Sequence, residues 1–305
     1  MKLKNELAWS VSRINLFREC KRKYYYRYYG SWGAWEPEAT DEQKELYLLK
    51  NLTTLDIATG NKVHKIITQI LRSSSQGKKF STKGFCALFE KNFGYFIKNS
   101  ESLLHRKFPK IGGLIRHEYS IPIPQEDIDE SIKQGKLCIE NFILSDLLKE
   151  IKSVKIDNWF FCRDFNFFSM DSIKVWAIFD FAFKNNDILK IVDFKTGKSR
   201  DSKKDVQSLN YALYFSKIHN IPLEKIEFLY HHLYPNKIDS FKFTSEDIQS
   251  IKSTIKKEYG EMKSLLTNKE LNIATLDDFP KTKEINKCNY CQFRRYCEKK
   301  EGGVV

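Results

Sequence analysis

The stretch that decides the fold of this chain is WAIFDFAFKNNDILKIVDFKTGKSRDSKKDVQSLNY, residues Trp176–Tyr211. It predicts a strand over Ile173–Phe183, which carries Asp180, and a second strand over Ile188–Phe194. The residues between the strands, Lys184–Asp187, have a normal length for a hairpin connection. We therefore expect the two strands to pair as neighbours in one sheet.

Three charged side chains gather at the end of this hairpin. Asp193 ends the second strand and Lys195 stands just past it, so in an extended chain both project to the same side. Strand pairing can bring Asp180 to the same place. Two carboxylates beside an ammonium are costly to bring together unless a cation lies between the acids. Carboxylate oxygens suit a hard divalent ion, so we expect Mg²⁺ or Mn²⁺ here.

Two further motifs flank the hairpin. A helix is expected over Asp201–His219, where Gln207 and Tyr211 lie one turn apart and share a face. Upstream, the run Gly60-Asn61-Lys62-Val63-His64 opens a helix and places the histidine in its first turn, at the edge of an apolar stripe. Taken singly, each of these patterns is common on protein surfaces, and only their combination and order carry information.

In that order the motifs resemble the PD-(D/E)XK nuclease superfamily, in its RecB-like branch. The resemblance implies an α/β fold in which a central mixed sheet of the restriction-endonuclease-like type is flanked by helices and carries a helical insertion. It also implies a deoxyribonuclease, expected to be an exonuclease, that depends on Mg²⁺ or Mn²⁺. The residues it assigns are Asp180, Asp193, Lys195, Gln207 and Tyr211 in catalysis and His64, Asp180, Asp193 and the Phe194 carbonyl as metal ligands.

Composition agrees with a folded protein that binds a polyanion. The 305 residues are 41% hydrophobic and 14% aromatic, which argues against disorder. Lys and Arg number 52 against 39 Asp and Glu, and the net charge of +13 with a pI near 9.2 favours nucleic acid first and an anionic membrane second. No apolar run approaches the roughly 20 residues that span a bilayer, and Met1–Trp9 lacks a signal core, so a cytoplasmic location is expected.

The seven cysteines fall into two groups. Cys86, Cys138 and Cys162 lie in apolar contexts typical of buried thiols. The second group places one cysteine near the N-terminus and three in a C-x₂-C-x₅-C pattern, which in a reducing compartment indicates metal rather than disulfides. Its members are Cys20, Cys288, Cys291 and Cys297.

This second layout resembles the iron–sulfur subset of RecB-like nucleases, which includes AddB-type subunits and CRISPR adaptation exonucleases. The resemblance implies a 4Fe–4S cluster that ties the two chain ends together, and four thiolates are the right ligand set for it. Tetrahedral zinc would satisfy the same four ligands.

The N-terminal region has two interpretations. Residues Ser10–Gly30 predict one helix with Cys20 in its middle, followed by Lys21-Arg22-Lys23 and the tyrosine-rich run Tyr24–Tyr29. Cations beside aromatic rings can clamp phosphates and stack bases. Alternatively, the tyrosines pack against neighbouring elements and only the cations face water.

Periodicity predicts the remaining elements. Further helices are expected over Glu42–Ala58, after Gly60, over Thr82–Phe108 and over Ile128–Ile151, and the chain then changes to strands from Val154. After the Asp201–His219 crossover helix, a parallel strand is expected over Lys225–Tyr234, an edge strand over Lys237–Phe243, and a helix capped at Thr244 that ends near Leu266.

These elements predict three regions. Residues 1–40 and 244–305 would form a split iron–sulfur region, residues 41–152 a helical region, and residues 153–243 the nuclease core. The resemblance implies as partners single-stranded or duplex DNA ends and a helicase or a CRISPR or other defence protein, with roles in repair, recombination or antiviral defence. An iron–sulfur scaffolding subunit with little activity, and RNA as substrate, stay open as alternatives.

Overall fold

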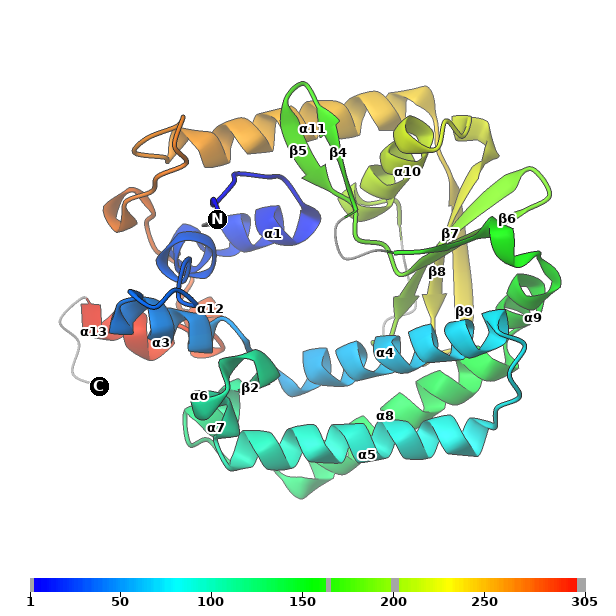
Figure 1. The fold of residues 1–305 in the computed structure, drawn as a ribbon, viewed down its shortest axis with the longest axis horizontal. Helices are drawn as coiled ribbons and strands as arrows, with labels where there is room; N and C mark the ends of the chain where they lie inside the picture. Colours follow the sequence, from blue (N-terminus) through cyan, green and yellow to red (C-terminus); the bar gives the residue numbers. More distant parts are fainter. Residues whose placement is uncertain (1–2, 163–165, 199–202, 301–305) are drawn as a thin grey trace.

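The computed structural model describes residues 3–162, 166–198 and 203–300. A twisted five-stranded sheet stands at one end, with helices on both of its faces, and the two ends of the chain meet at the opposite end (Figure 1). Residues 1–2 and 301–305, which belong to the predicted split iron–sulfur region, lie outside the described residues.

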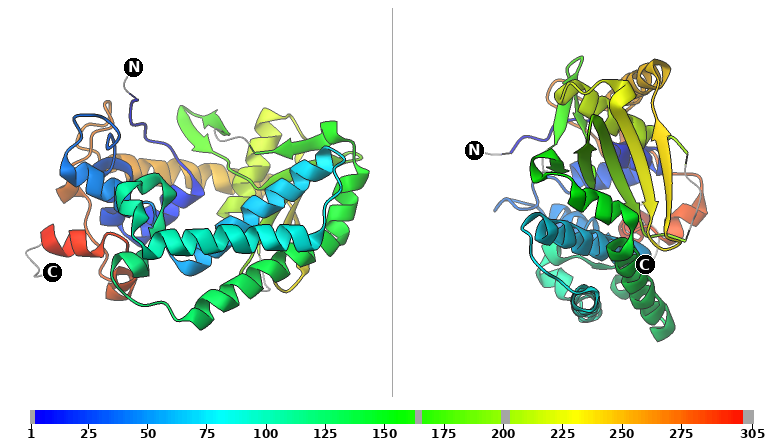
Figure 2. Two further views of the ribbon diagram at one scale, coloured as in Figure 1. Left: turned by 60° about the horizontal axis from the view of Figure 1, so that its bottom comes forward. Right: turned by 90° about the vertical axis from the view of Figure 1, so that its right-hand side faces the viewer.

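The central sheet is mixed, as predicted. Its order is β3-β6-β7-β8-β9, in which β7 and β8 pair in parallel and every other neighbouring pair is antiparallel (Figure 2, right). The parallel step confirms the expected crossover through a helix. The strands are β3 (Trp159–Phe161), β6 (Phe181–Asn185), β7 (Ile188–Lys195), β8 (Ile226–His232) and β9 (Lys237–Lys242).

Strand β7 is buried on both faces because its side chains alternate between two cores. Ile191 packs into the core beneath α10 (Val206–Ile218) and α11 (Ser245–Ser264), whereas Val192 packs into the core beneath α4 (Leu55–Ser75). A strand covered by helices on both faces is expected to read as a nearly continuous apolar run, and β7 does so up to Asp193.

Three long helices cover one face of the sheet. They are α4, α5 (Thr82–Glu101) and α8 (Gln125–Leu144), which pack on one another through Ile66, Phe89 and Phe142 (Figure 1). Two helix predictions are wrong in their ends: the helix expected over Thr82–Phe108 stops at Glu101, and the helix expected over Ile128–Ile151 is divided at Ser145, so that α8 stops at Leu144. Smaller elements in this half are β1 (Leu52–Thr53), α6 (Leu104–Lys107), β2 (Gly113–Leu114), α7 (Ile115–Glu118) and α9 (Asp146–Ser153).

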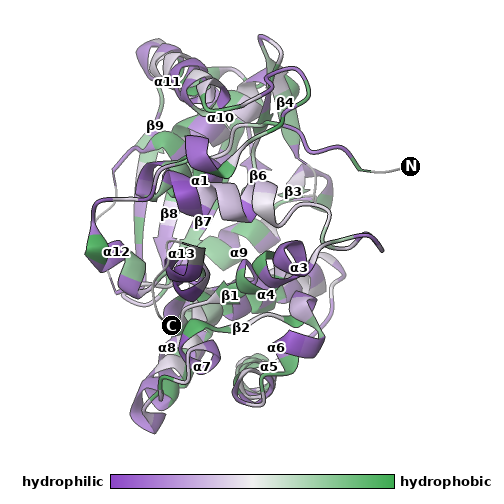
Figure 3. Ribbon diagram, turned by 90° about the vertical axis from the view of Figure 1, so that its left-hand side faces the viewer, coloured by the Kyte–Doolittle hydropathy of each residue, from purple (hydrophilic) through white to green (hydrophobic). Residues whose placement is uncertain are grey.

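The two chain ends lie side by side. The backbone N–H of Arg22 donates to the carbonyl of Pro280, 3.1 Å away, and the rings of Tyr26 and Phe293 are 5.5 Å apart. Figure 3 looks onto this end of the molecule. The elements are α1 (Val11–Glu19), α2 (Lys21–Tyr25), a π-helical turn over Tyr26–Gly30, α3 (Asp41–Leu49), α12 (Ile285–Asn289) and α13 (Arg294–Lys300).

The expected single helix over Ser10–Gly30 is wrong in its continuity. Ser10 caps α1 as predicted, but Cys20 adopts an extended backbone with φ −163°, which ends α1. The Cys20 thiol then accepts a hydrogen bond from the N–H of Lys23, 3.4 Å away, and so caps α2. The helical spacing of the apolar residues did not predict that Cys20 lies between two separate helices.

The start of α4 and the end of the helix before it also differ from the sequence prediction. Helix α4 begins at Leu55 and runs through Gly60, so His64 lies in its third turn and not in its first. Thr54 caps this helix by accepting from the N–H of Ile57, and the residues before it form a short strand where a continuous helix over Glu42–Ala58 was expected.

The first predicted hairpin strand is also shorter than expected. Residues Ile173–Trp176 form β5, which pairs with β4 (Phe167–Met170) in a separate two-stranded sheet. Asp180 then precedes β6 and lies in the connection between the two sheets. The start of the crossover helix, predicted at Asp201, lies outside the described residues, and α10 begins at Val206. Within the described ranges, no helix has the length and apolarity needed to cross a bilayer.

Candidate active site

Strand β7 delivers a buried carboxylate to the end of the sheet. Asp193 is 4% exposed and pairs in register with Tyr230 of β8. It follows Ile191 by two residues and therefore faces α10. Lys195 faces the same way, and its Nζ lies 2.6 Å from Asp193 Oδ2 and 5.0 Å from the centre of the Tyr230 ring.

Asp180 bridges three parts of the chain. Its Oδ2 accepts a hydrogen bond from the backbone N–H of Phe194 at 2.8 Å, and its Oδ1 lies 2.9 Å from Nδ1 of His64 on α4. Burial lowers the pKa of His64, but the hydrogen bond and charge of Asp180, with the charge of Asp193, outweigh it and raise the pKa above its usual value. The histidine that the sequence singled out thus lies against the first predicted acid.

Helix α10 supplies the other two predicted residues. Gln207 donates from Nε2 to Asp193 Oδ1 at 2.9 Å and to the Tyr211 hydroxyl at 3.0 Å, and its Oε1 accepts from Lys195 Nζ at 3.3 Å. Tyr211 in turn donates to the backbone carbonyl of Ile178. Gln207 therefore uses both ends of its carboxamide to fix the distance between Asp193 and Lys195.

A capping box positions this helix. Asp205 accepts at its side chain from the N–H of Ser208, and Ser208 accepts at its hydroxyl from the N–H of Asp205. The cap fixes the first turn of α10 and so aims Gln207 at the strand end. The Asp-x-x-Ser pattern before an apolar run was a readable signal that sequence reasoning missed.

The two carboxylates influence each other electrostatically. Burial and the charge of Asp180 raise the pKa of Asp193 to about 6, while the ammonium of Lys195 acts in the opposite direction. A buried acid beside a second acid is the arrangement in which a bound cation is most stabilising, since the cation offsets the repulsion.

The donor set fits a hard divalent ion by its chemistry. Asp193 Oδ2 is buried, and its charged neighbour is the ammonium of Lys195, 2.6 Å away. Within residues 3–162, 166–198 and 203–300, however, no three His, Cys, Asp or Glu side chains form a ready-made group able to hold a metal ion. His64 and Asp180 contact each other instead, so a complete ligand set is not evident.

Gly60 is a further residue near this site. A Cβ at this position would lie 3.0 Å from Oγ1 of Thr196, the residue after Lys195. The lack of a side chain therefore lets the second turn of α4 approach the end of β7 closely. Sequence analysis identified Gly60 only as the first residue of a motif and did not predict that it lies against Thr196.

The four predicted cluster cysteines lie on elements that meet at the chain ends. Burial, helped by the nearby thiols of Cys20 and Cys288, raises the pKa of Cys291 to about 11, while Lys23 acts in the opposite direction. Cys297 influences the pKa of Tyr26 and packs with Cys291 around the same small core. These neighbours place the thiols in one region, but they too fail to form a ready-made metal-binding group within the described residues.

Two of the three cations in the N-terminal basic triplet contact other parts of the chain. Arg22 donates from Nε to the Phe279 carbonyl at 2.6 Å, and Lys23 pairs with Glu19 at 2.8 Å. Tyr24 and Tyr26 are fully buried, with exposed fractions of 0% and 1%. The packing interpretation is therefore correct for Tyr24 and Tyr26, whereas Tyr25, Tyr28 and Tyr29 are partly exposed.

A groove of about 1250 Å³ begins directly beyond the candidate site. It starts at Thr196–Lys198 and runs between the first half of α8 and the C-terminal cysteine segment. Its cations are largely matched by acids: Lys198 lies 3.3 Å from Glu130, and Arg116 lies 3.8 Å from Asp127.

Comparison with known proteins gives one family. A family model described as the PD-(D/E)XK nuclease superfamily matches residues 8–298, nearly the whole chain. A search of curated proteins gives no match.

Proposed function

This chain belongs to the PD-(D/E)XK nuclease superfamily, and we propose that it is a metal-dependent deoxyribonuclease whose active site is formed by Asp180, Asp193 and Lys195. Membership of this superfamily supports the coarser statement that the protein is a nuclease, which cleaves phosphodiester bonds. The observation that carries the finer proposal is the contact of Lys195 Nζ with Asp193 Oδ2 at 2.6 Å, beside the buried end of β7 and next to Asp180.

We assign the metal-binding role to four groups. Asp180 and Asp193 supply carboxylate oxygens, Phe194 supplies its backbone carbonyl, and His64 approaches from α4. A bound Mg²⁺ or Mn²⁺ would polarise the scissile phosphate and lower the pKa of a water molecule. These are oxygen donors with one imidazole, a combination that suits such ions.

Lys195 would stabilise charge in the reaction, and Gln207 and Tyr211 would position it. An ion held by both acids would take over the charge balance that Lys195 now supplies to Asp193, leaving the ammonium to face the substrate. From that position Lys195 Nζ can donate to the attacking water or to a phosphoryl oxygen on which negative charge develops. Gln207, anchored by Tyr211, limits how far the ammonium can move because it accepts from Nζ at 3.3 Å.

The direct test is cleavage of labelled single-stranded and duplex DNA, and of RNA, with Mg²⁺, Mn²⁺ or EDTA. We expect DNA cleavage that requires the metal and that Lys195→Ala abolishes while DNA binding persists. Full metal-dependent activity of that variant would refute the assignment of the site. Products of one nucleotide would indicate the exonuclease that the sequence suggests.

We also propose that Cys20, Cys288, Cys291 and Cys297 hold a 4Fe–4S cluster. The support is their number, their spacing and the mutual effect of three of the thiols on the Cys291 pKa. A brown protein with broad visible absorption that each Cys→Ala variant loses would support the cluster. A colourless protein with stoichiometric zinc would identify the site as a zinc site.

A second candidate function is a DNA-binding scaffold with little activity of its own, working with a helicase, a CRISPR protein or another defence protein in the cytoplasm. The net charge of +13 is compatible with it. DNA binding without cleavage under every metal condition would favour this candidate over the nuclease.

A further inference from the structure

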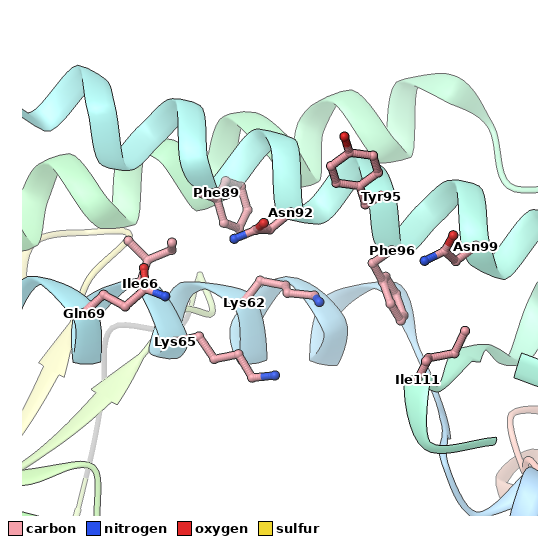
Figure 4. A pocket seen from close by; sticks show the side chains of 10 residues that line it. All are labelled: Lys62, Lys65, Ile66, Gln69, Phe89, Asn92, Tyr95, Phe96, Asn99 and Ile111. Atoms are coloured by element: carbon pink, nitrogen blue, oxygen red, sulfur yellow. The ribbon is translucent and has the colours of Figure 1, made fainter. Parts of the chain in front are cut away.

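A second polar cleft lies between α4 and α5, apart from the candidate active site. Its volume is about 370 Å³, and Figure 4 shows its lining side chains, all of which project from the two helices except Ile111. Lys62 precedes His64 by two residues and therefore points about 200° around the helix from it, given about 100° per residue. The polar lining residues are Lys62, Lys65, Gln69, Asn92, Tyr95 and Asn99.

The two lysines of this cleft, Lys62 and Lys65, lie beside each other without an acidic partner among the described residues. Within the described ranges, no carboxylate lies at ion-pair distance from Lys62 or Lys65, and the Lys62 ammonium rests over the Phe96 ring at 5.0 Å. A lysine on the neighbouring α8, Lys136, has its acid at 2.7 Å. Like charges three residues apart on a helix repel each other, so Lys62 and Lys65 together favour an anion.

The other polar side chains of the cleft are neutral, and the rest of its lining is apolar: Ile66, Phe89, Phe96 and Ile111. Gln69, Asn92 and Asn99 make no side-chain hydrogen bond to any part of the chain that the structure describes. Tyr95 is 57% exposed and presents an aromatic ring at the same place. No aspartate or glutamate lines the cleft, in contrast to the larger groove beyond β7, whose lining includes Glu130.

Two ammonium groups with carboxamide donors and no acid match a phosphate. We propose that this cleft binds backbone phosphates of the DNA strand whose scissile bond lies at Asp180 and Asp193. The inference rests on the proposed nuclease function and adds to it a positioning surface on α4 and α5. It commits to a nucleic-acid strand; a free oligophosphate shares the chemistry and is a separate outcome of the test.

The position of the cleft favours a nucleic-acid strand as its ligand and not a small free anion. His64 and Lys65 are consecutive residues of α4, so the helix presents the candidate metal site on one side and the cleft on the other. A helix is about 10–12 Å across, which a strand of a few nucleotides covers. A strand that enters the metal site can therefore cross α4 and bring an adjoining phosphate to Lys65 and then to Lys62.

The test measures binding and does not depend on cleavage. Binding of a labelled single-stranded oligonucleotide is titrated in EDTA at several salt concentrations, for the wild type and for K62Q/K65Q. The matched control is K78Q/K79Q, which removes the same charge from an exposed loop after α4. A further variant, K62R/K65R, keeps the charge, and thermal melting of each variant reports whether it is folded.

We expect K62Q/K65Q to weaken binding and to reduce the slope of log K against log salt by about 0.7 for each lost phosphate contact. The control and K62R/K65R should keep the wild-type slope. Unchanged affinity and slope in K62Q/K65Q, or an equal loss in the control, would overturn the inference.

Two more measurements separate the remaining cases. If pyrophosphate raises the melting temperature of the wild type but not of K62Q/K65Q, while DNA binding is the same in both, the cleft is a small-anion site and the inference is wrong. If the wild type cleaves no DNA but K62Q/K65Q still loses the salt-dependent contacts, the cleft stands and the proposed nuclease function fails.

Discussion

Nδ1 of His64 lies 2.9 Å from Oδ1 of Asp180, although 116 residues separate them in the chain. The other oxygen of Asp180 accepts from the N–H of Phe194 at 2.8 Å. One carboxylate therefore connects helix α4, the segment before β6, and the end of β7. This connection brings the upstream motif and the hairpin motif to one place.

The first prediction concerns this contact. His64→Ala should weaken Mn²⁺ binding and raise the metal concentration needed for half-maximal cleavage, because a donor on the α4 side is lost. Cleavage should recover at high Mn²⁺. The measurement is activity against metal concentration, with His219→Ala, an exposed histidine at the end of α10, as the control. An unchanged metal requirement in His64→Ala would remove this histidine from the ligand set.

The second prediction concerns Lys195. Replacing it by alanine should lower kcat by about 100- to 1000-fold, the cost of removing one donor aimed at developing charge. Binding of DNA in EDTA should change little. The control is Lys190→Ala on the same strand, whose ammonium pairs with Glu150 at 2.6 Å, away from Asp193. Equal loss of kcat in both variants would indicate damage to the strand and not loss of a catalytic group.

The third prediction concerns Gln207. Its carboxamide contacts Asp193, Lys195 and Tyr211 at 2.9–3.3 Å, so Gln207→Ala should lower activity by about 10- to 100-fold, as removal of a group that orients ligands does. Most of the effect should be in kcat. Gln125→Ala, on the exposed start of α8, should be neutral. An effect of Gln207→Ala confined to KM would instead assign the residue to substrate binding.

The fourth prediction concerns pH. Burial and the charge of Asp180 raise the pKa of Asp193 from 3.8 to about 6 in the folded protein, so the folded state binds this proton more tightly than the unfolded state. In EDTA, its contribution to the free energy of unfolding should therefore fall as pH rises from 3.8 to about 6. Mn²⁺ affinity should change in the opposite sense and increase over the same interval, because the ion competes with the proton.

Chemical denaturation across that pH range checks this expectation. Asp193→Asn should lose the pH-dependent contribution. Asp146→Asn is the control, because Lys149 lowers the pKa of that exposed carboxyl and no proton is gained on folding. The same pH trend in wild type and Asp193→Asn would show that another group is responsible.

The fifth prediction concerns packing of the helical layer. A Cβ on Gly135 of α8 would lie 2.1 Å from the ring of Phe89 on α5, so Gly135→Ala should destabilise the protein by about 1–3 kcal/mol through overpacking. Gly94 of α5 has open space at its Cβ position, and Gly94→Ala should stabilise by about 0.4–1 kcal/mol. Denaturant midpoints compare the two substitutions. Similar effects of both would contradict the close packing at Gly135.

The sequence by itself determined the central hairpin, the parallel strand after the crossover helix and the family. These follow from local patterns: apolar runs of strand length, a Thr244 cap, and acids placed at a strand end. Asp193 and Lys195 share one side of β7 because side chains alternate along any strand, which requires no tertiary information.

Only the tertiary structure decided where the distant groups lie. Periodicity did not reveal that Cys20 interrupts a helix, that α4 starts before Gly60, or that Asp180 lies in a connection between two sheets. Each depends on contacts across the chain: Arg22 with the Pro280 carbonyl, α4 with the end of β7, and Asp180 with His64. Local propensity is set by neighbours within a few residues, whereas these positions are set by burial and hydrogen bonding between segments more than 100 residues apart.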